Sequence, residues 1–276
     1  MRCVLVSKPC LYKQGMACNL QKRKKSYMPE GPSLLILKEA ISKFKNKKII
    51  EAKGNAKIDF SLLINKKVVD LKVWGKQLFI CLDDLTIRIH LLMFGSYSID
   101  EQTKPDKSLR LKLSFQKGSL YFYTCSVRIL EDNLDELYDW EADVLSDRWN
   151  PSKAKKKLRA MPGTLVCDAL LDQQIFSGVG NIIKNEVLYR IRLHPETLIA
   201  NIPARKLTEL VYEARNYSFD FLKWKKAFVL KKHWLAHTKK ICLRCNLPLI
   251  KKYCGKTKRR TFFCENCQVK YGKPKS

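Results

Sequence analysis

The chain has 276 residues, of which 46% are hydrophobic, and its 54 Lys and Arg against 26 Asp and Glu give a formal charge of +28. A chain of this length buries a substantial core and has room for two domains and a smaller module. The charge favours a nucleic acid as partner, because each neutralised phosphate releases counterions. An anionic membrane surface, or lysine-rich solubility without any partner, is the alternative. No uninterrupted apolar run reaches about 18 residues, so we expect no membrane span.

Residues 1–27 differ from the rest, with seven Lys or Arg, three cysteines and no acidic residue. The apolar stretch at residues 3–6 is too short for a signal-peptide core, which argues against secretion. The segment fits a disordered basic arm, a targeting segment, or translated sequence upstream of the true start. We therefore treat residues 1–28 as a basic extension that is disordered or absent from the mature protein.

The next part of the chain predicts one helix followed by strands. Apolar residues recur at a helical period over residues 34–44. Short strand-like runs then follow, separated by Gly, Asp or Lys turns, at residues 68–73, 77–82, 86–91, 109–115 and 120–123. Closely spaced short strands of this kind favour an antiparallel sandwich. We assign residues 29–150 to this domain.

The second half of the chain has helical periods. The Asn150-Pro151 step predicts a helix start and a boundary, and residues 163–226 have helical periodicity. Between helices lies Gly178-Val179-Gly180-Asn181, a turn that permits close backbone approach and presents amide donors at a helix N-terminus. Tight helix packing explains such a Gly-x-Gly turn equally well. We assign residues 151–235 to a helical domain and residues 236–276 to a terminal module with a basic tail.

Two CxxC pairs separated by eighteen residues mark that module, and they consist of Cys242, Cys245, Cys264 and Cys267. This spacing predicts one tetrahedral Zn²⁺ held by four thiolates, a closed coordination sphere with a structural role. Cys254 lies between the pairs without a CxxC partner, so we expect a free buried thiol. The seven remaining cysteines are scattered singly, which favours a reducing intracellular compartment over a disulfide framework.

Five motifs follow one another along the chain: residues 28–32 (Met-Pro-Glu-Gly-Pro), Gly75-Lys76, residues 90–95 (His-Leu-Leu-Met-Phe-Gly), residues 178–181, and Arg259 five positions before Cys264. Together they resemble the formamidopyrimidine-DNA glycosylase and endonuclease VIII (Fpg/Nei) family. The resemblance implies an α+β multidomain fold, with an N-terminal antiparallel β-sandwich and flanking helices, a helix-two-turn-helix domain, and a C-terminal β-hairpin zinc finger. It implies base-excision repair of damaged DNA by a DNA glycosylase that is also an abasic-site lyase. Such an enzyme needs access to DNA, in the cytoplasm, nucleoid or nucleus.

The chemistry implied by the resemblance begins at Pro29. An amine must attack the sugar C1′ and hold the opened sugar as a Schiff base. A proline at a free N-terminus supplies a secondary amine, whose pKa near 8 leaves an appreciable neutral fraction at pH 7. Pro29 qualifies only if translation starts at Met28 and the methionine is removed; otherwise it is a turn residue. Glu30 beside it is the proton donor that the resemblance implies.

The other site residues also follow from the resemblance. Lys76, which we expect on a strand, contacts the phosphate at the lesion and helps to donate protons. Met93 intercalates into the vacancy left by a flipped nucleotide, with Leu92 and Phe94 as helpers; the alternative is that Met93 and Phe94 are core residues of a sheet. Asn181 and Arg259 grip the flanking phosphates. Arg260 is a competing candidate for the arginine.

Three departures from the family pattern bear on the substrate. Ser33 stands where many relatives have Glu, and residues 124–129 (Thr-Cys-Ser-Val-Arg-Ile) stand where the guanine-lesion branch has Asp-Pro-Arg-Arg-Phe-Gly. The interval from Asn181 to Cys242 leaves little room for a lesion-capping loop. Because the Met-Pro-Glu-Gly-Pro start is also closer to endonuclease VIII, we expect oxidised pyrimidines and related ring-opened or hydantoin lesions to be preferred over 8-oxoguanine paired with cytosine.

Two other functions are compatible with parts of the sequence. A catalytically blocked DNA-damage-binding protein would keep the fold, the finger and the phosphate grip if Pro29 is not the mature N-terminus. An RNA-binding zinc-ribbon protein would explain the charge and the cysteines but not the Pro-Glu start. We expect a monomer that acts on damaged DNA, most simply duplex, with one structural zinc.

Overall fold

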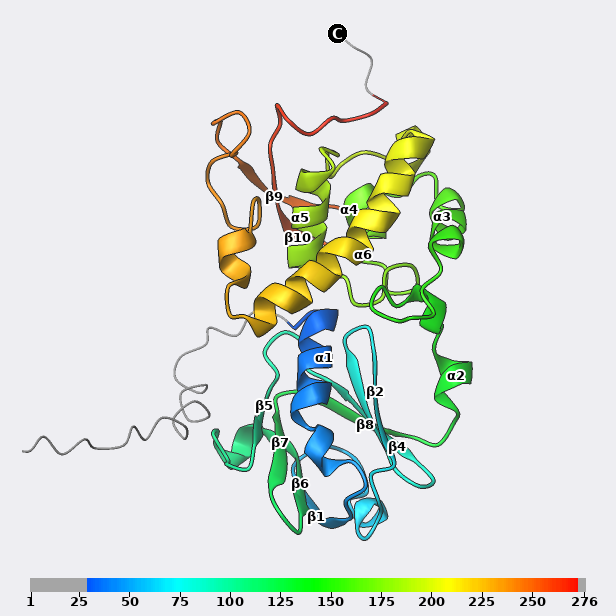
Figure 1. Cartoon of the computed structure of the whole chain (residues 1–276), viewed down its shortest axis with the longest axis vertical. Helices are drawn as coiled ribbons and strands as arrows, with labels where there is room; N and C mark the ends of the chain where they lie inside the picture. The colour runs from blue at the N-terminus through cyan, green and yellow to red at the C-terminus, as the bar shows by residue number, and fades with distance from the viewer. Residues whose placement is uncertain (1–28, 273–276) are drawn as a thin grey trace, which may run out of the picture.

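The computed structural model describes residues 29–272, so the expectation for residues 1–28 lies outside the described part of the chain. A β-sandwich forms one half of the molecule and a group of helices the other (Figure 1). Helix α1 (Gly31–Ala40) lies between the halves, and a two-stranded hairpin of β9 (Ile250–Cys254) and β10 (Arg259–Phe263) packs beside α5 (Asn181–Arg190). The expected α+β architecture is confirmed.

The sandwich consists of two four-stranded antiparallel sheets. The first has the order β1-β6-β7-β5, with strands Ile49–Lys53, Leu109–Phe115, Ser119–Tyr123 and Ser96–Ile99. The second has the order β2-β3-β4-β8, with strands Asp70–Trp74, Gln77–Cys81, Thr86–His90 and Ser126–Leu130. Buried and partly exposed residues alternate strictly along β6, as expected for a strand with one face on the core.

Helix α1 begins three residues before its predicted start. Glu30 is its N-cap in extended conformation, and Pro32 occupies the first turn, where a missing backbone N–H costs nothing. Leu34 and Leu37 are fully buried in the sandwich core, a burial that stabilises by about 1.5–3 kcal/mol for each side chain. Because α1 contacts β2, β3 and α6 (Ala204–Lys226), it joins the two halves immediately after the motif that begins at Pro29.

A helix starts at Pro151 as predicted, with Asn150 capping α3 (Pro151–Arg159) by accepting a 3.0 Å hydrogen bond from Lys153 N. The core of the helical half unites α3, α5 and α6 around fully buried apolar residues. The remaining α-helices are α2 (Leu134–Leu137) and α4 (Val166–Ala169), and short 3₁₀ turns lie at Ser42–Phe44, Ser61–Leu63, Asp106–Ser108, Trp140–Ala142, Ile199–Asn201 and Leu230–His233. None of the helices within residues 29–272 is long and apolar enough to cross a membrane.

Candidate active site

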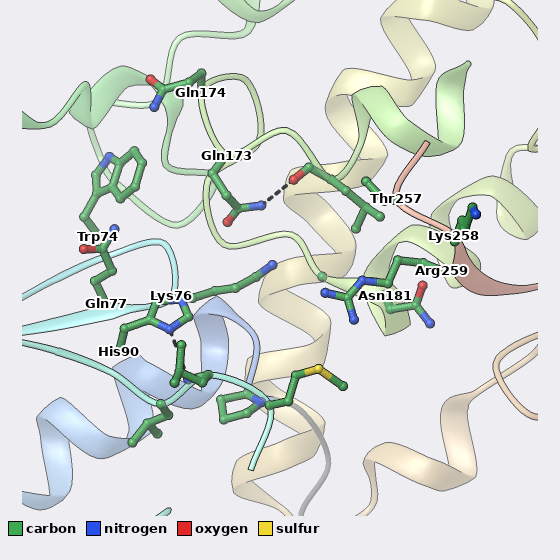
Figure 2. A pocket seen from close by; sticks show the side chains of 16 residues that line it. Trp74, Lys76, Gln77, His90, Gln173, Gln174, Asn181, Thr257, Lys258 and Arg259 are labelled. Carbon is green, nitrogen blue, oxygen red and sulfur yellow. Dashed lines mark hydrogen bonds between the residues drawn. The ribbon is translucent and has the colours of Figure 1, made fainter. Parts of the chain in front are cut away.

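A cleft of about 800 Å³ opens where the sandwich, the helical half and the hairpin meet. Five residues singled out from the sequence line it together: Pro29, Lys76, Met93, Asn181 and Arg259. In Figure 2 the side chains of Lys76 and Arg259 enter the cleft from opposite sides, one from the sandwich and one from the hairpin. The cleft therefore brings together segments that are more than two hundred residues apart.

Lys76 lies in the turn between β2 and β3, and its predicted place on a strand is wrong. Gly75 causes the turn, since its φ of +56° belongs to the left-handed region and a Cβ there would lie 2.1 Å from Ser177 Oγ. Buried Asp143 holds the turn by accepting a 2.8 Å hydrogen bond from Gly75 N. Burial of the ammonium lowers the pKa of Lys76, and the charge of Arg259 lowers it further, whereas Glu30 opposes the shift.

Glu30 is 1% exposed and does not itself line the cleft; its carboxyl lies against the lining residue Gly180. Its carboxylate accepts hydrogen bonds from Ile182 N at 2.7 Å and Ile183 N at 3.2 Å, the amides at the N-terminus of α5. Burial raises the pKa of Glu30, while Lys76 and the two amides oppose the rise. Burial thus shifts the pKa of the carboxyl up and that of Lys76 down, the arrangement expected of a proton donor beside a readily deprotonated amine.

The Gly178–Asn181 turn connects the helical half to this carboxylate. Gly178 has φ +97°, and its carbonyl accepts a 2.9 Å hydrogen bond from Gly31 N. Gln173 closes the turn, with Oε1 accepting from Gly178 N and Nε2 donating to Val179 O, both at 3.1 Å. The close backbone approach that the Gly-x-Gly turn predicts is confirmed, since the backbones of Gly31 and Gly178 are joined by the 2.9 Å hydrogen bond. The sequence does not predict this role of Gln173, because a glutamine imposes no backbone geometry on its neighbours.

A strained turn at the cleft mouth carries exposed apolar side chains. Leu92 has φ +53°, and the turn is closed by hydrogen bonds from Leu92 N to His90 Nδ1 at 3.0 Å and from Gly95 N to Leu91 O at 2.8 Å. Leu92, Met93 and Phe94 are 50%, 46% and 71% exposed. The alternative that Met93 and Phe94 belong to a sheet core is therefore wrong.

The structure separates the two arginine candidates. Arg259 begins β10 and lines the cleft, whereas the side chain of Arg260 is exposed and does not belong to the cleft lining. Arg260 participates through its carbonyl, which accepts a 2.9 Å hydrogen bond from Asn181 Nδ2 and a 3.3 Å bond from Asn185 Nδ2. Asn181, the first residue of α5, thus connects that helix to the hairpin.

The four paired cysteines form one cluster at the base of the hairpin. All four Sγ atoms lie within 4.8 Å of one another, with Cys242–Cys267 at 3.8 Å and Cys245–Cys264 at 3.5 Å. Tetrahedral zinc with Zn–S bonds near 2.3 Å requires S–S separations of about 3.8 Å, so the donor set fits that ion. Cys254 is buried and lies outside the cluster, as predicted.

Seven further cleft residues were not identified from the sequence: Trp74, Gln77, Leu171, Gln173, Gln174, Thr257 and Lys258. Trp74 Nε1 donates to Asp139 O at 2.9 Å, and Gln77 Oε1 accepts from Tyr138 at 3.1 Å, both contacts across more than sixty residues. Because their partners are remote along the chain, local sequence carries no signal for them.

Two family models match the chain. Residues 28–129 match the formamidopyrimidine-DNA glycosylase N-terminal domain, and residues 141–217 match the formamidopyrimidine-DNA glycosylase H2TH domain. Endonuclease 8-like 3 of Bos taurus is 30% identical over 222 residues, which cover 78% of this chain and 37% of that protein. Formamidopyrimidine-DNA glycosylase of Ligilactobacillus salivarius is 29% identical and covers 88% of this chain and 99% of its own length. The chain thus spans little more than a third of the endonuclease 8-like 3 relatives.

Solved structures share the fold. A viral DNA glycosylase superposes with a TM-score of 0.76 at 21% identity, covering 87% of this chain and all of its own. The Lactococcus lactis formamidopyrimidine-DNA glycosylase, bound non-covalently to DNA with an abasic site, superposes with a TM-score of 0.78 at 21% identity over the same shares.

Proposed function

Because this chain belongs to the formamidopyrimidine-DNA glycosylase and endonuclease VIII family, we propose that it removes oxidised bases from DNA and cuts the strand at the resulting abasic site. Within the family, the chain belongs to the endonuclease VIII-like branch. One observation carries the proposal. Pro29, Lys76, Asn181 and Arg259 line one cleft, and the buried Glu30 carboxyl lies against Gly180, which also lines it.

The proposed reaction starts with the Pro29 amine. In its neutral form the nitrogen attacks C1′ of the damaged nucleotide and the C1′–base bond breaks. The base leaves with the bonding electrons and takes up a proton, which balances the proton that the nitrogen gives up. Glu30, whose pKa is raised by burial, protonates the ring oxygen, so that the sugar opens and a Schiff base forms between Pro29 and C1′. The Glu30 carboxylate, having lost its proton, accepts one from C2′, and the C3′–O bond breaks and expels the 3′ phosphate. Loss of the C4′ proton to water then breaks the C5′–O bond and releases the 5′ phosphate.

The remaining cleft residues bind DNA in this proposal. Lys76, Asn181 and Arg259 contact phosphates beside the flipped nucleotide, with charge-assisted hydrogen bonds from the two cations. Met93, on the exposed turn, enters the base stack. The Cys242, Cys245, Cys264 and Cys267 thiolates would hold one Zn²⁺, which supplies no chemistry and keeps the hairpin folded.

We infer a preference for oxidised pyrimidines from what surrounds the site. The β7–β8 connection consists of Thr124 and buried Cys125 alone, so it has no projecting loop that would read the opposite strand. Ser33, where many relatives have Glu, accepts a 2.6 Å hydrogen bond from Lys225 Nζ. Neither residue lines the cleft, so this hydrogen bond gives Ser33 a contact between α1 and α6, and the inferred preference rests on the short β7–β8 connection.

The nucleophile assignment requires Pro29 at the N-terminus, because the nitrogen of an internal proline is a tertiary amide. The match to the N-terminal domain model begins at residue 28, which agrees with a start at Met28. The blocked DNA-binding protein is the alternative outcome if the preceding residues remain attached.

Borohydride trapping separates the two outcomes. Protein produced from Met28 is incubated with duplex DNA containing thymine glycol, 5-hydroxyuracil, or 8-oxoguanine opposite cytosine, and the Schiff base is reduced to a covalent adduct. We expect adducts with both pyrimidine lesions, and none from protein in which one extra residue stays joined to the Pro29 nitrogen and makes it a tertiary amide. If the protein that starts at Pro29 forms no adduct, the proposed enzyme activity is refuted. If an unprocessed chain from Met1 forms the adduct normally, the assignment of Pro29 as the nucleophile is refuted.

A further inference from the structure

A carboxylate of the helical half holds the tip of the hairpin. Asp168, in the short helix α4, accepts three hydrogen bonds from the turn that connects β9 to β10. Its Oδ2 accepts from Lys256 N at 2.9 Å, and its Oδ1 accepts from Thr257 N at 3.2 Å and Thr257 Oγ1 at 3.0 Å. Hydrogen bonds to a charged acceptor are stronger than those between neutral groups. Three such bonds hold the tip of the hairpin to a single carboxylate.

The turn is shaped to admit this carboxylate. Gly255 has φ +71°, and a Cβ on it would lie 2.3 Å from both oxygens of Asp168. Lys258, at the other end of the turn, has φ +44° and donates from its N to Gly255 O at 3.2 Å. A non-glycine residue in this left-handed region is strained and persists where the surroundings hold it.

The same turn carries the cleft residues of the hairpin. Thr257, Lys258 and Arg259 all line the cleft and are seen together at its right-hand side in Figure 2. Arg259 follows the turn directly and pairs with Cys254 as the first residue of β10. A displacement of the turn therefore displaces Arg259.

The cysteine cluster lies at the opposite end of the hairpin. Cys264 follows Phe263, which pairs with Ile250 at the base, whereas the Asp168 contacts are at the tip. Five residues of strand separate the two ends, a length of roughly 16 Å. A metal at the base fixes the fold of the module, and Asn181 and Asn185 hold β10 at the Arg260 carbonyl. The Asp168 contacts lie beyond these bonds and fix the turn itself.

We propose that Asp168 is a positioning residue that sets Arg259 against the DNA phosphate. This inference rests on the proposed function, in which Arg259 binds the phosphate beside the flipped nucleotide. Asp168 acts through the backbone of the turn and does not itself contact the substrate.

The sign of the effect separates positioning from simple electrostatics. Asp168 is a negative charge close to a surface that binds a polyanion, so removing its charge alone strengthens DNA binding. Removing the positioning contacts weakens DNA binding. Asp168→Asn is the sharpest substitution, because an amide keeps the shape and one acceptor but turns its NH₂ toward a backbone N–H that is itself a donor. Asp220→Asn, at an exposed site on α6, removes the same charge and is the matched control.

The experiment measures the Kd for a duplex that contains a tetrahydrofuran abasic-site analogue, and KM and kcat for strand cutting at a natural abasic site. We expect Asp168→Asn to raise Kd and KM by roughly ten- to a hundredfold, the scale of one lost hydrogen bond to a charged acceptor, with a much smaller change in kcat. Asp220→Asn leaves Kd unchanged or lowers it. Thr257→Val, which removes one of the three hydrogen bonds and no charge, has a smaller effect in the same direction as Asp168→Asn.

Coupling to Arg259 tests the route of action. In an Arg259→Ala background, Asp168→Asn should change Kd by less than about twofold, because the group that it positions is absent. The inference is overturned if the Asp168→Asn protein binds the abasic-site duplex as tightly as the Asp220→Asn protein. It is also overturned if the fold-changes in Kd caused by Asp168→Asn and Arg259→Ala simply multiply in the double variant. If Asp168→Asn fails to fold, the same comparison is made with Thr257→Val. Failure of the wild-type protein to trap abasic DNA refutes the proposed function instead, and the Kd comparison still decides the role of Asp168.

Discussion

Gly180→Ala tests whether the placement of Glu30 depends on the turn that covers it. Gly180 is the N-cap of α5 with φ −122°, a conformation that alanine adopts without strain. A Cβ on it would lie 2.4 Å from Glu30 Cδ and 2.6 Å from Oε1. The substitution therefore acts by pushing against one carboxyl group.

The structure gives the size of the effect. Ordinary contact begins at 3.4 Å, so the carboxyl carbon must retreat from 2.4 Å by about 1 Å, which stretches the 2.7 Å bond from Ile182 N beyond hydrogen-bonding range. Hydrogen bonds to a charged group contribute about 1.5–3 kcal/mol each, and the bond from Ile183 N weakens too, so we expect a loss of about 2–4 kcal/mol in the free energy of unfolding. A displaced general acid lowers kcat by at least about a hundredfold.

The assay combines thermal melting with single-turnover cutting of abasic DNA. A destabilisation of this size lowers Tm by roughly 5–15 °C in a protein of this length. Gly163→Ala is the matched control, since a Cβ at Gly163 meets nothing within 4 Å. The reasoning is refuted if Gly180→Ala melts and cuts like Gly163→Ala.

Three further perturbations have defined outcomes. Met93→Ala should raise the KM for lesion duplex roughly tenfold, because apolar surface equal to about two methylene groups is no longer buried in the base stack. The control Leu62→Ala, at an exposed position, should leave the KM unchanged. Equal KM values for the two variants contradict insertion of Met93. Metal analysis should find one zinc per chain, and Cys264→Ser should lower both the zinc content and the affinity for abasic DNA; tight binding by zinc-free protein contradicts the structural role. Burial lowers the pKa of Lys184 from 10.5 to about 8. Between those pH values the unfolded chain binds more protons than the folded chain, so the free energy of unfolding rises with pH, by on the order of 3 kcal/mol. Lys184→Met should remove that part of the rise in denaturant titrations at pH 8 and pH 10.5, and an unchanged slope contradicts the assignment.

Residues with special chemistry or special backbone geometry could be located from the sequence. The CxxC spacing predicts the cysteine cluster, the Asn150-Pro151 step marks a helix start, and Gly178 and Gly180 mark a close approach. Each signal is local, because a thiolate pair, an N-cap or a glycine imposes its geometry on its own neighbours.

Features that depend on distant partners could not be located in the same way. Strand β1 (Ile49–Lys53) has a charged and half-exposed pattern and forms only by pairing with β6. Lys76 lies in a turn because Gly75 meets Ser177 and Asp143, which lie far along the chain. Asp168 has its partners 88 and 89 residues away, so nothing in its own neighbourhood distinguishes it from a surface acid.

The hydrogen bonds between Glu30 and the start of α5 have a consequence for the order in which the protein is made. The carboxylate is translated near the beginning of the described chain, and its two amide donors follow 152 and 153 residues later. A nascent or truncated chain that ends before Ile182 therefore contains Pro29 and Glu30 but lacks both amides that hold the Glu30 carboxylate. In the proposed reaction, the acid is therefore in place only after α5 has been synthesised and has docked against the start of the chain.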